Sequence, residues 1–476
     1  MTIRRPVTML WLLASVALAT AGCGVLTANN KELTRADAML AGGDAEAALA
    51  ALGTRNDLPG RLQRATILAS MGDATASNQE FDLAIADIRK FEERATLSAT
   101  EGVLGLGSLV VNDKTMEYQG QGYEKVLVHT LKARNYLLLG DEEAARVEIR
   151  NSNMRQDEER ERHRKAIEAA AEEAETRKVD LSGLSAEIDR TFEPSAAILQ
   201  RLDNVYQNPF ATYVSGIVYE LNGEPDDAFI DYRKAYEMVP NGVIAADLAR
   251  LGATTRRGAE LRRIGLTAPA ARTAPGDTLV IIDNGLAPER RELKFPLPGP
   301  KTVLFAAVPI THPVPTNMRE AEILAEDGTV LGRTEVMVDV EAMSVRNLRD
   351  LYPGILVRQL IRLAGKAVAG KTAADELGWA GVLLSSTANA ITEQADLRAW
   401  YGLPRSIHVA RVRAEGAERI GVRILDWNDR PIQETEVPLA AGTRTMKVVN
   451  LRYLNGRVMV AVPPERRAPL QSAREI

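Results

Sequence analysis

The sequence has only one cysteine and four histidines among its 476 residues. A single cysteine cannot form a disulfide within the chain, and a leftover cysteine in an exported protein favours modification of its thiol. His129, His163, His312 and His408 are scattered, and none has a second histidine or a cysteine at the spacing of metal ligands. The sequence therefore predicts no metal site and no cofactor.

Motifs that mark common catalytic sites are also missing. The chain contains no G-x-S-x-G turn, no Walker A loop and no dinucleotide-binding fingerprint. Gly102, Gly105 and Gly107 precede a polar stretch rather than a convincing helix. We therefore expect no enzymatic activity and assign no catalytic residues.

Aromatic residues make up 5% of the chain, whereas 45% of residues are hydrophobic and alanine is plentiful, which favours close-packed helices over an all-β protein. The formal net charge of -5 gives no general electrostatic reason to bind nucleic acid. After residue 22 no stretch reaches the roughly 20 apolar residues of a membrane-spanning helix. The most apolar stretch, Leu377 to Ile391, is too short and is predicted to be a buried helix.

The first 22 residues have the pattern of a secretory signal peptide. Arg4 and Arg5 precede an uncharged stretch, and small residues precede Cys23. This arrangement resembles a bacterial lipobox, although Thr20 stands where leucine is commonest. The resemblance implies cleavage before Cys23, diacylglycerylation of its thiol and acylation of the new N-terminus. An ordinary cleaved signal peptide or a retained anchor helix are the alternatives.

Acyl chains on Cys23 would anchor the protein stably in a membrane. Residues 23–30 would then form a tether. Gly24 follows the cysteine, so the aspartate that resembles an inner-membrane retention signal is missing. We expect the protein at the periplasmic face of the outer membrane.

The segment from Pro209 to Pro240 has the pattern of one helix-turn-helix repeat, with its turn at Gly223. Its small and aromatic packing positions are Gly216, Tyr219, Ala228, Tyr232 and Ala235. This spacing resembles the tetratricopeptide repeat (TPR), in which small residues let two helices approach closely and aromatic residues fill the groove. Such a repeat binds other proteins and carries no chemistry.

The same spacing recurs around three other turns, at Gly43, Gly72 and Gly140. The equivalent packing positions at the last of these include Ala133, Tyr136 and Ala145. In each turn glycine can adopt a left-handed cap, and the acidic residue after it can cap the next helix. The repeats predict a TPR-like α-solenoid over residues 31–268. A generic antiparallel helical bundle is the alternative, because the units are unevenly spaced.

Two segments interrupt the repeats. Residues 101–122 are too glycine-rich for a regular unit and predict an irregular connection. Residues 155–178 are densely charged, with Glu158 and Arg162, and Glu161 and Lys165, at i,i+4 spacing. The second segment predicts a long solvated helix, with a coiled-coil contact to a partner as the less favoured interpretation.

From residue 275 the pattern changes to short strand-like runs, which continue to about residue 465. The strand candidates are Thr278 to Ile282, Thr302 to Val308, Glu335 to Val340, Ser406 to Arg413, Arg419 to Leu425, Thr445 to Val449 and Arg457 to Val462. A helical insertion is predicted over residues 345–392, with a possible break near Gly370, and residues 466–476 form a flexible tail. The predicted fold is α+β and multidomain: an N-terminal TPR-like α-solenoid, then a β-rich, sandwich-like domain with a helical insertion.

Two groups of residues in this second half are candidate partner contacts. Arg358, Arg362 and Lys366 recur every four residues and form a basic stripe on one helix face. The stripe is either a solvated face or a docking site for an acidic partner or lipid phosphates. The other group is Asp396, Arg398 and Trp400, which is either a structural clasp or a recognition pocket.

Several short motifs resemble a family of bacterial lipoproteins that combine an N-terminal helical-repeat region with a C-terminal β-rich domain. In the helical half they are Tyr123-Glu124-Lys125-Val126-Leu127, Ala133-Arg134-Asn135-Tyr136-Leu137 and Ala145-Arg146-Val147-Glu148. In the second half they are Asp283-Asn284-Gly285-Leu286-Ala287-Pro288, Ala395-Asp396-Leu397-Arg398-Ala399-Trp400, Leu403-Pro404 and Arg411. The resemblance implies an envelope lipoprotein and brings no catalytic residues.

Two functions from different classes fit these observations. The first is a lipid-anchored periplasmic scaffold that holds another envelope protein through its helical repeats. The alternative is a lipoprotein that binds or processes a glycan, such as peptidoglycan or a polysaccharide, through its β-rich domain.

Overall fold

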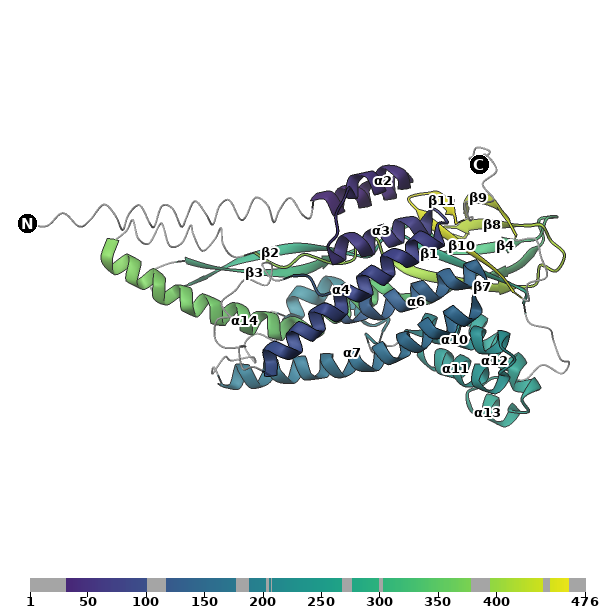
Figure 1. Ribbon diagram of the computed structural model, residues 1–476, viewed down its shortest axis with the longest axis horizontal. Helices are drawn as coiled ribbons and strands as arrows, with labels where there is room; N and C mark the ends of the chain where they lie inside the picture. The colour runs from purple at the N-terminus through teal and green to yellow at the C-terminus, as the bar shows by residue number, and fades with distance from the viewer. Residues whose placement is uncertain are drawn as a thin grey trace, which may run out of the picture.

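Figure 1 shows the protein as a computed structural model with helices in the first half and strands in the second. It describes residues 31–100, 117–176, 188–202, 205–206, 208–267, 276–298, 303–377, 394–439 and 446–461. Within these ranges, nothing is stated of the side chains of residues 95–100, 295–298, 303–305 and 364–377. The predicted signal peptide, Cys23, the tether, residues 101–116 of the glycine-rich interruption and the tail fall outside the described residues. The fold is α+β, as predicted.

The helices of the first half form a consecutive array. Their bounds are α2 Ala45–Leu52, α3 Leu58–Ser70, α4 Ala74–Thr100, α6 Gly122–Leu139, α7 Glu142–Thr176, α9 Ala196–Leu199, α10 Pro209–Leu221, α11 Pro225–Met238, α12 Gly242–Thr254 and α13 Gly258–Arg263. Successive helices contact one another: α3 packs on α4, α4 on α6, α6 on α7, α7 on α10, and α10 on α11. The chain therefore folds as a series of helical hairpins (Figure 1).

Four turns of this array have the same backbone geometry. Gly43, Gly72, Gly140 and Gly223 have φ values of 81°, 84°, 78° and 75°. In each turn the glycine N–H donates to the carbonyl three residues back, and the next N–H donates to the carbonyl five residues back. These paired bonds satisfy the carbonyls that a helix C-terminus leaves open. The predicted left-handed glycine caps are confirmed at all four positions.

The predicted acidic caps are confirmed at three of the four turns. The side chains of Asp44, Asp73 and Asp141 accept hydrogen bonds from backbone N–H groups three residues on, at 2.8, 2.9 and 2.9 Å. At the fourth turn the prediction is wrong, because the longer side chain of Glu224 makes no cap bond. Glu224 instead reaches Arg146 on α7, at 3.1 Å, and links two neighbouring hairpins.

The described strands form two sheets and one long hairpin. The five-stranded sheet has the order β11-β10-β1-β7-β6, with bounds β1 Thr278–Asn284, β6 Glu335–Asp339, β7 Ser406–Val412, β10 Lys447–Leu454 and β11 Arg457–Val460. In it β1 pairs parallel with β10 and antiparallel with β7. The four-stranded sheet has the order β5-β4-β8-β9, with bounds β4 Glu320–Leu324, β5 Val330–Arg333, β8 Arg419–Leu425 and β9 Pro431–Pro438.

The hairpin consists of β2 Glu289–Pro298 and β3 Val303–His312, paired antiparallel over their whole length. Strands β2, β4, β5 and β9 were not among the predicted strands. Helix α14, Val340–Leu377, begins at the end of β6, contacts β3 and extends alongside the hairpin (Figure 1). The helix therefore begins five residues before the predicted start of the insertion at residue 345. Its possible break near Gly370 is wrong, because α14 continues through that residue.

The five-stranded sheet lies between the helices and the four-stranded sheet. Leu279 and Ile281 of β1 belong to a core shared with the helices. Val280 and Ile282, which alternate with them, pack in a second core with the four-stranded sheet, for example with Val422. Because successive side chains of a strand point to opposite faces, one strand serves both cores. The helical array and the strands are thus joined by a continuous apolar interior.

The β half covers one face of the helical array. Helices α3 and α6 contact β10, α10 contacts β6, and α12 contacts β7. Most of these are the first helices of their hairpins. The face that these helices present is therefore occupied by the chain's own sheet rather than free for a partner.

Candidate functional site

A partly enclosed cavity of about 340 Å³ lies where α7, α14 and the β2–β3 hairpin meet. Its polar lining residues are Gln121, Arg290, Asn347, Asp350, Arg358, Gln359, Gln394 and Asp396. Its apolar lining includes Ala166, Ile167, Ala170, Leu348, Leu351 and Ile355. A concave site with apolar walls and a few convergent polar groups is the usual form of a ligand-binding pocket.

The two acidic residues among the described lining of the cavity are already paired. Asp350 accepts from Arg346 at 3.1 Å, one turn away on α14. Asp396 accepts from Arg398 at 2.8 Å. These ion pairs neutralise both carboxylates, so the cavity does not have the unpaired acidic groups of a cation site.

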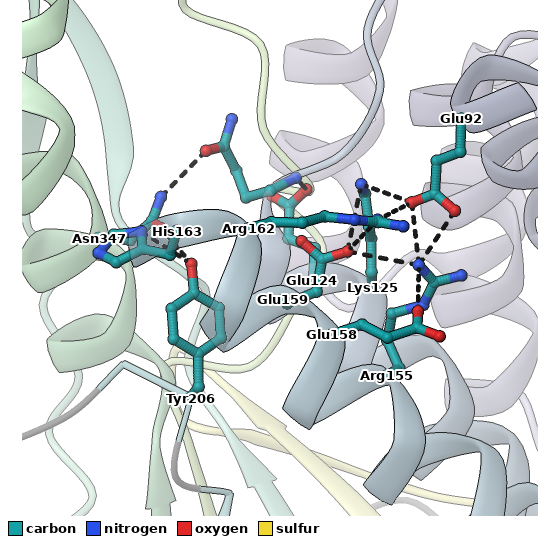
Figure 2. Close-up of polar contacts among 11 residues, drawn as sticks. Glu92, Glu124, Lys125, Arg155, Glu158, Glu159, Arg162, His163, Tyr206 and Asn347 are labelled. Carbon is teal, nitrogen blue, oxygen red and sulfur yellow. Dashed lines mark hydrogen bonds and ion pairs between the residues drawn. The ribbon is translucent and has the colours of Figure 1, made fainter. Parts of the chain in front are cut away.

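A set of polar residues borders the cavity on the α7 side. The Tyr206 hydroxyl lies 3.0 Å from His163 Nδ1 and donates to Asn347 Oδ1 at 3.4 Å (Figure 2). Asn347 in turn donates to Gln121 Oε1 at 3.0 Å. Burial, aided by the charge of Glu159, raises the pKa of Tyr206, so the phenol is neutral at physiological pH. The set therefore holds Gln121 and Asn347 in fixed positions at the cavity wall.

Next to it lies a cluster of three carboxylates and three cations, which we call the α4–α6–α7 charge cluster: Glu92, Lys125, Arg155, Glu158, Glu159 and Arg162 (Figure 2). Glu92 accepts from Lys125 at 3.0 Å, from Arg155 at 2.9 Å and from Arg162. Because its charges balance, the cluster can join the three helices in the interior at little electrostatic cost.

The helix predicted over residues 155–178 is present and reaches Thr176, and most of its described side chains are exposed, as expected of a solvated helix. Arg155 and Glu159 depart from this pattern, because they are buried in the charge cluster. Arg162 pairs with Glu159 and Glu92 rather than with Glu158 as the i,i+4 spacing predicted. The predicted pair of Glu161 and Lys165 is present at 3.5 Å.

Glu92 is expected to link the stability of the protein to pH. Burial opposes its ionisation, but Lys125, Arg162 and Arg155 outweigh burial and hold its pKa at about 2, below the ordinary 4.5. Since the folded pKa is depressed, its contribution is fully present above about pH 4.5 and is lost as pH falls towards 2. Glu92→Gln should therefore lower the free energy of unfolding at pH 7 and make its decline below pH 4.5 shallower, as measured by urea unfolding across pH.

Glu93→Gln is the matched control, because Glu93 is the exposed neighbour of Glu92 on α4. It should leave the pH dependence close to that of the native protein. Equal slopes for the two variants between pH 2 and 5 would contradict the role of Glu92.

The residues of the predicted basic stripe do not share one environment. Arg358 lines the cavity, whereas Arg362 is 5% exposed and lies in the interior. The prediction of a solvent-facing or docking stripe is therefore wrong for Arg362, since α14 is packed against α7 and β3. Lys366 lies on α14, but its side chain is outside the described residues.

The group of Asp396, Arg398 and Trp400 forms a structural clasp in this structure. Asp396 and Arg398 bond to each other, and the Arg398 guanidinium lies over the Tyr118 ring at 5.6 Å. Trp400 is 1% exposed, and its Nε1 donates to Thr66 of α3 at 2.8 Å. Trp400 thus joins the two halves of the molecule, and its predicted role as a partner contact is wrong because the ring is buried.

The predicted repeat-packing residues lie between the helices. Those that are fully buried are Ala133, Ala145, Gly216, Ala228, Tyr232 and Ala235. A Cβ atom on Gly216 would lie 2.5 Å from the Tyr232 ring, so glycine is needed for this close approach. Tyr136 and Tyr219 are partly buried, with the charged groups of Lys132 and Arg146 each 5.6 Å from their rings.

Sequence reasoning did not find the residues that give the cavity its polarity. Arg290 lies on β2, whereas Asn347 and Gln359 lie on α14. Because at least 57 positions separate Arg290 from the other two, the three residues form no recognisable sequence motif. In the described part of the chain, no group of His, Cys, Asp and Glu side chains could hold a metal ion. None of the described helices combines the length and apolar character that a membrane span needs.

Comparisons with known proteins give little beyond these observations. No family model matches the chain, and no curated protein matches it. A solved structure to which it is similar is the TPR2AB-domain:pHSP90 complex of yeast Sti1, with a TM-score of 0.20 and 13% sequence identity. That match covers 49% of this chain and 86% of the other. At this TM-score the likeness carries no argument about fold or function.

Proposed function

We propose that this protein is a lipid-anchored scaffold of the bacterial envelope, which belongs among the lipoproteins it resembles and holds another envelope protein without catalysing a reaction. The observation that carries the proposal is the series of hairpins closed by the same turn at Gly43, Gly72, Gly140 and Gly223. Repeats of this kind build extended binding surfaces for other proteins.

The partner surface lies on the second helices of the hairpins, because the β half already covers the first ones. Large apolar side chains are exposed there, among them Leu83 on α4, and Val147 and Met154 on α7. Val147 and Met154 are seven residues apart and therefore share a helix face. Exposed apolar side chains on neighbouring helices are typical of protein contact surfaces.

In-cell photo-crosslinking tests this surface. A photoreactive residue at Met154 should trap one dominant envelope protein, identified by mass spectrometry. The same residue at Arg419, an exposed position on β8, is the matched control and should not trap it. The same set of crosslinked proteins from both positions would contradict the proposed surface.

Cys23→Ala tests the lipid anchor separately. Without the thiol no acyl chain can be attached, so the protein should move from the outer-membrane fraction to the soluble periplasmic fraction. Fractionation followed by immunoblotting measures the shift. Continued recovery with the outer membrane would refute the anchor without affecting the scaffold proposal.

A second candidate function is glycan binding through the β half, and one observation favours it. Trp427, on the turn between β8 and β9, is 63% exposed, and an exposed aromatic ring can stack on a sugar. Retention of the protein by purified cell-wall sacculi, with loss of retention in Trp427→Ala, would support this function. Failure of sacculi to retain the native protein would exclude peptidoglycan as the ligand.

A further inference from the structure

Arg290, which lines the cavity between α7 and α14, is a buried arginine without an ion-pair partner among the described residues. Arg290 is 8% exposed and lines the cavity. Its one hydrogen bond among the described residues runs from Nη1 to the backbone carbonyl of Arg398, at 3.3 Å. Its Nε is buried without a partner, and among the described residues Arg290 forms no ion pair. Burying an unpaired charge is costly, so such sites are normally completed by an opposite charge.

The Glu124 carboxyl interacts electrostatically with Arg290, but it already has other hydrogen-bond partners. Glu124 accepts hydrogen bonds from the backbone N–H groups of Gln121 and Trp400, both at 2.8 Å, and from the Tyr118 hydroxyl. Burial raises the pKa of Glu124. Glu124 therefore does not replace a counter-ion placed directly on Arg290.

The carboxylates that line the cavity do not serve as counter-ions to Arg290. Asp350 and Asp396 are each bonded to an arginine outside the lining. The amides of Gln121 and Asn347 contribute polar groups that are held in place by hydrogen bonds. A ligand with one negative charge would complement this arrangement.

The apolar part of the wall indicates what the anion is attached to. Ala166, Ile167 and Ala170 face the cavity from α7, and Leu348, Leu351 and Ile355 face it from α14. Ile167 is an exposed large hydrophobic residue, so a ligand that covers it would remove apolar surface from water. Inorganic phosphate or sulfate would satisfy Arg290 but would leave these walls uncovered.

We propose that this cavity binds an amphiphilic monocarboxylate, with the carboxylate on Arg290 and an aliphatic body between α7 and α14. Two sources share this chemistry: a free fatty acid of medium length, and the C-terminus of a peptide that ends in an aliphatic residue. The inference does not depend on the scaffold proposal, because it concerns a different surface of the molecule.

Isothermal titration calorimetry of the full chain with octanoate, N-acetyl-L-leucine and octanamide tests the site. Octanoate or N-acetyl-L-leucine should bind, and the tighter of the two identifies the source. Octanamide, which has the same chain as octanoate without its charge, should bind about 10-fold or more weakly, as expected for loss of a charged hydrogen bond. Arg290→Gln should remove the preference for the carboxylate over the amide.

A cavity-filling variant keeps the test valid if Arg290→Gln does not fold. Ala166→Phe places a ring in the cavity from the exposed side of α7, and should weaken binding about 10-fold or more by steric exclusion. Ala169→Phe is the matched control, because Ala169 is exposed on the same helix and does not line this cavity. Binding of neither carboxylate, equal affinity for octanoate and octanamide, or equal effects of the two phenylalanines would overturn the proposal.

Discussion

Replacing Trp400 with alanine is expected to lower the free energy of unfolding by about 3–5 kcal/mol. The indole is 1% exposed, lies edge-on to Phe81 with ring centroids 5.8 Å apart, and donates to Thr66 at 2.8 Å. The substitution leaves a large cavity and removes the hydrogen bond to Thr66, whose hydroxyl still donates to the Leu62 carbonyl. Urea unfolding followed by circular dichroism measures the change.

Trp427→Ala is the matched control for this substitution. The Trp427 ring is mostly exposed, so its removal should change the free energy of unfolding by no more than about 0.5 kcal/mol. Similar losses for both variants, or a loss below about 1 kcal/mol for Trp400→Ala, would show that Trp400 does not hold the two halves together.

Trp400 is one of several residues that connect the helices to the β half of the molecule. Beside it, the Gly402 N–H donates to Gln63 of α3 at 2.8 Å, and Arg134 of α6 pairs with Asp283 of β1 at 2.7 Å. These contacts bury polar groups between helices and strands that are far apart in sequence. The helices and the sheet are therefore expected to unfold in one transition, and to lose hydrogen-exchange protection together in Trp400→Ala.

The parts of the fold that were predicted correctly depend on local interactions. A glycine followed by aspartate determines its own turn, because both hydrogen bonds and the cap lie within a few residues of Gly72 or Gly140. The small and aromatic positions of the repeat are similarly local, as shown by Gly216 against Tyr232. These features can be read from one segment without knowledge of the rest of the chain.

The missed strands depend on their neighbours instead. Strand β9 is polar, but Glu434 on it pairs with Arg423 of β8, which also pairs with Glu322 of β4. This row of charges across three strands stabilises the outer face of the sheet, and its members lie 11 and 101 positions apart. Strands held by cross-strand ion pairs lack the apolar alternation by which sequence patterns are recognised.

Burial of charged residues was missed for the same reason. Residues 155–178 have the composition of a solvated helix, yet Glu159 and Arg155 are buried because Glu92 and Lys125 on other helices balance their charges. The cavity beside them is likewise made by side chains from several elements. The sequence could therefore predict the helix but neither its buried charges nor the candidate site.

Replacing Arg411 with methionine is expected to destabilise the protein by about 3–5 kcal/mol, the usual loss when one partner of a buried ion pair is removed. Arg411 on β7 donates to Glu220 of α10 and to Asp247 of α12, both at 2.9 Å, and its side chain is buried. Methionine keeps much of the volume but leaves the two carboxylates to share Arg250. Urea unfolding at pH 7 measures the loss.

Arg413→Met is the matched control, because Arg413 pairs at 2.7 Å with the exposed Glu415 just beyond the same strand. An exposed pair contributes about 0–1 kcal/mol, so this variant should be close to the native protein in stability. If Arg411→Met loses no more stability than Arg413→Met, then Arg411 contributes no more than an exposed ion pair does. Its network would then not join β7 to the helices.

The pH dependence of the Arg411→Met loss provides a second test of its cause. Burial raises the pKa of Glu220, but Arg411 and Arg250 outweigh burial and hold it below the ordinary 4.5. The stabilisation from this ion pair is therefore present above about pH 4.5 and is lost as pH falls through the folded pKa. The difference between native protein and variant should be largest near pH 7 and should shrink in acid. A loss independent of pH would instead indicate packing, and would leave the repeat from Pro209 to Pro240 joined to the sheet by apolar contacts alone.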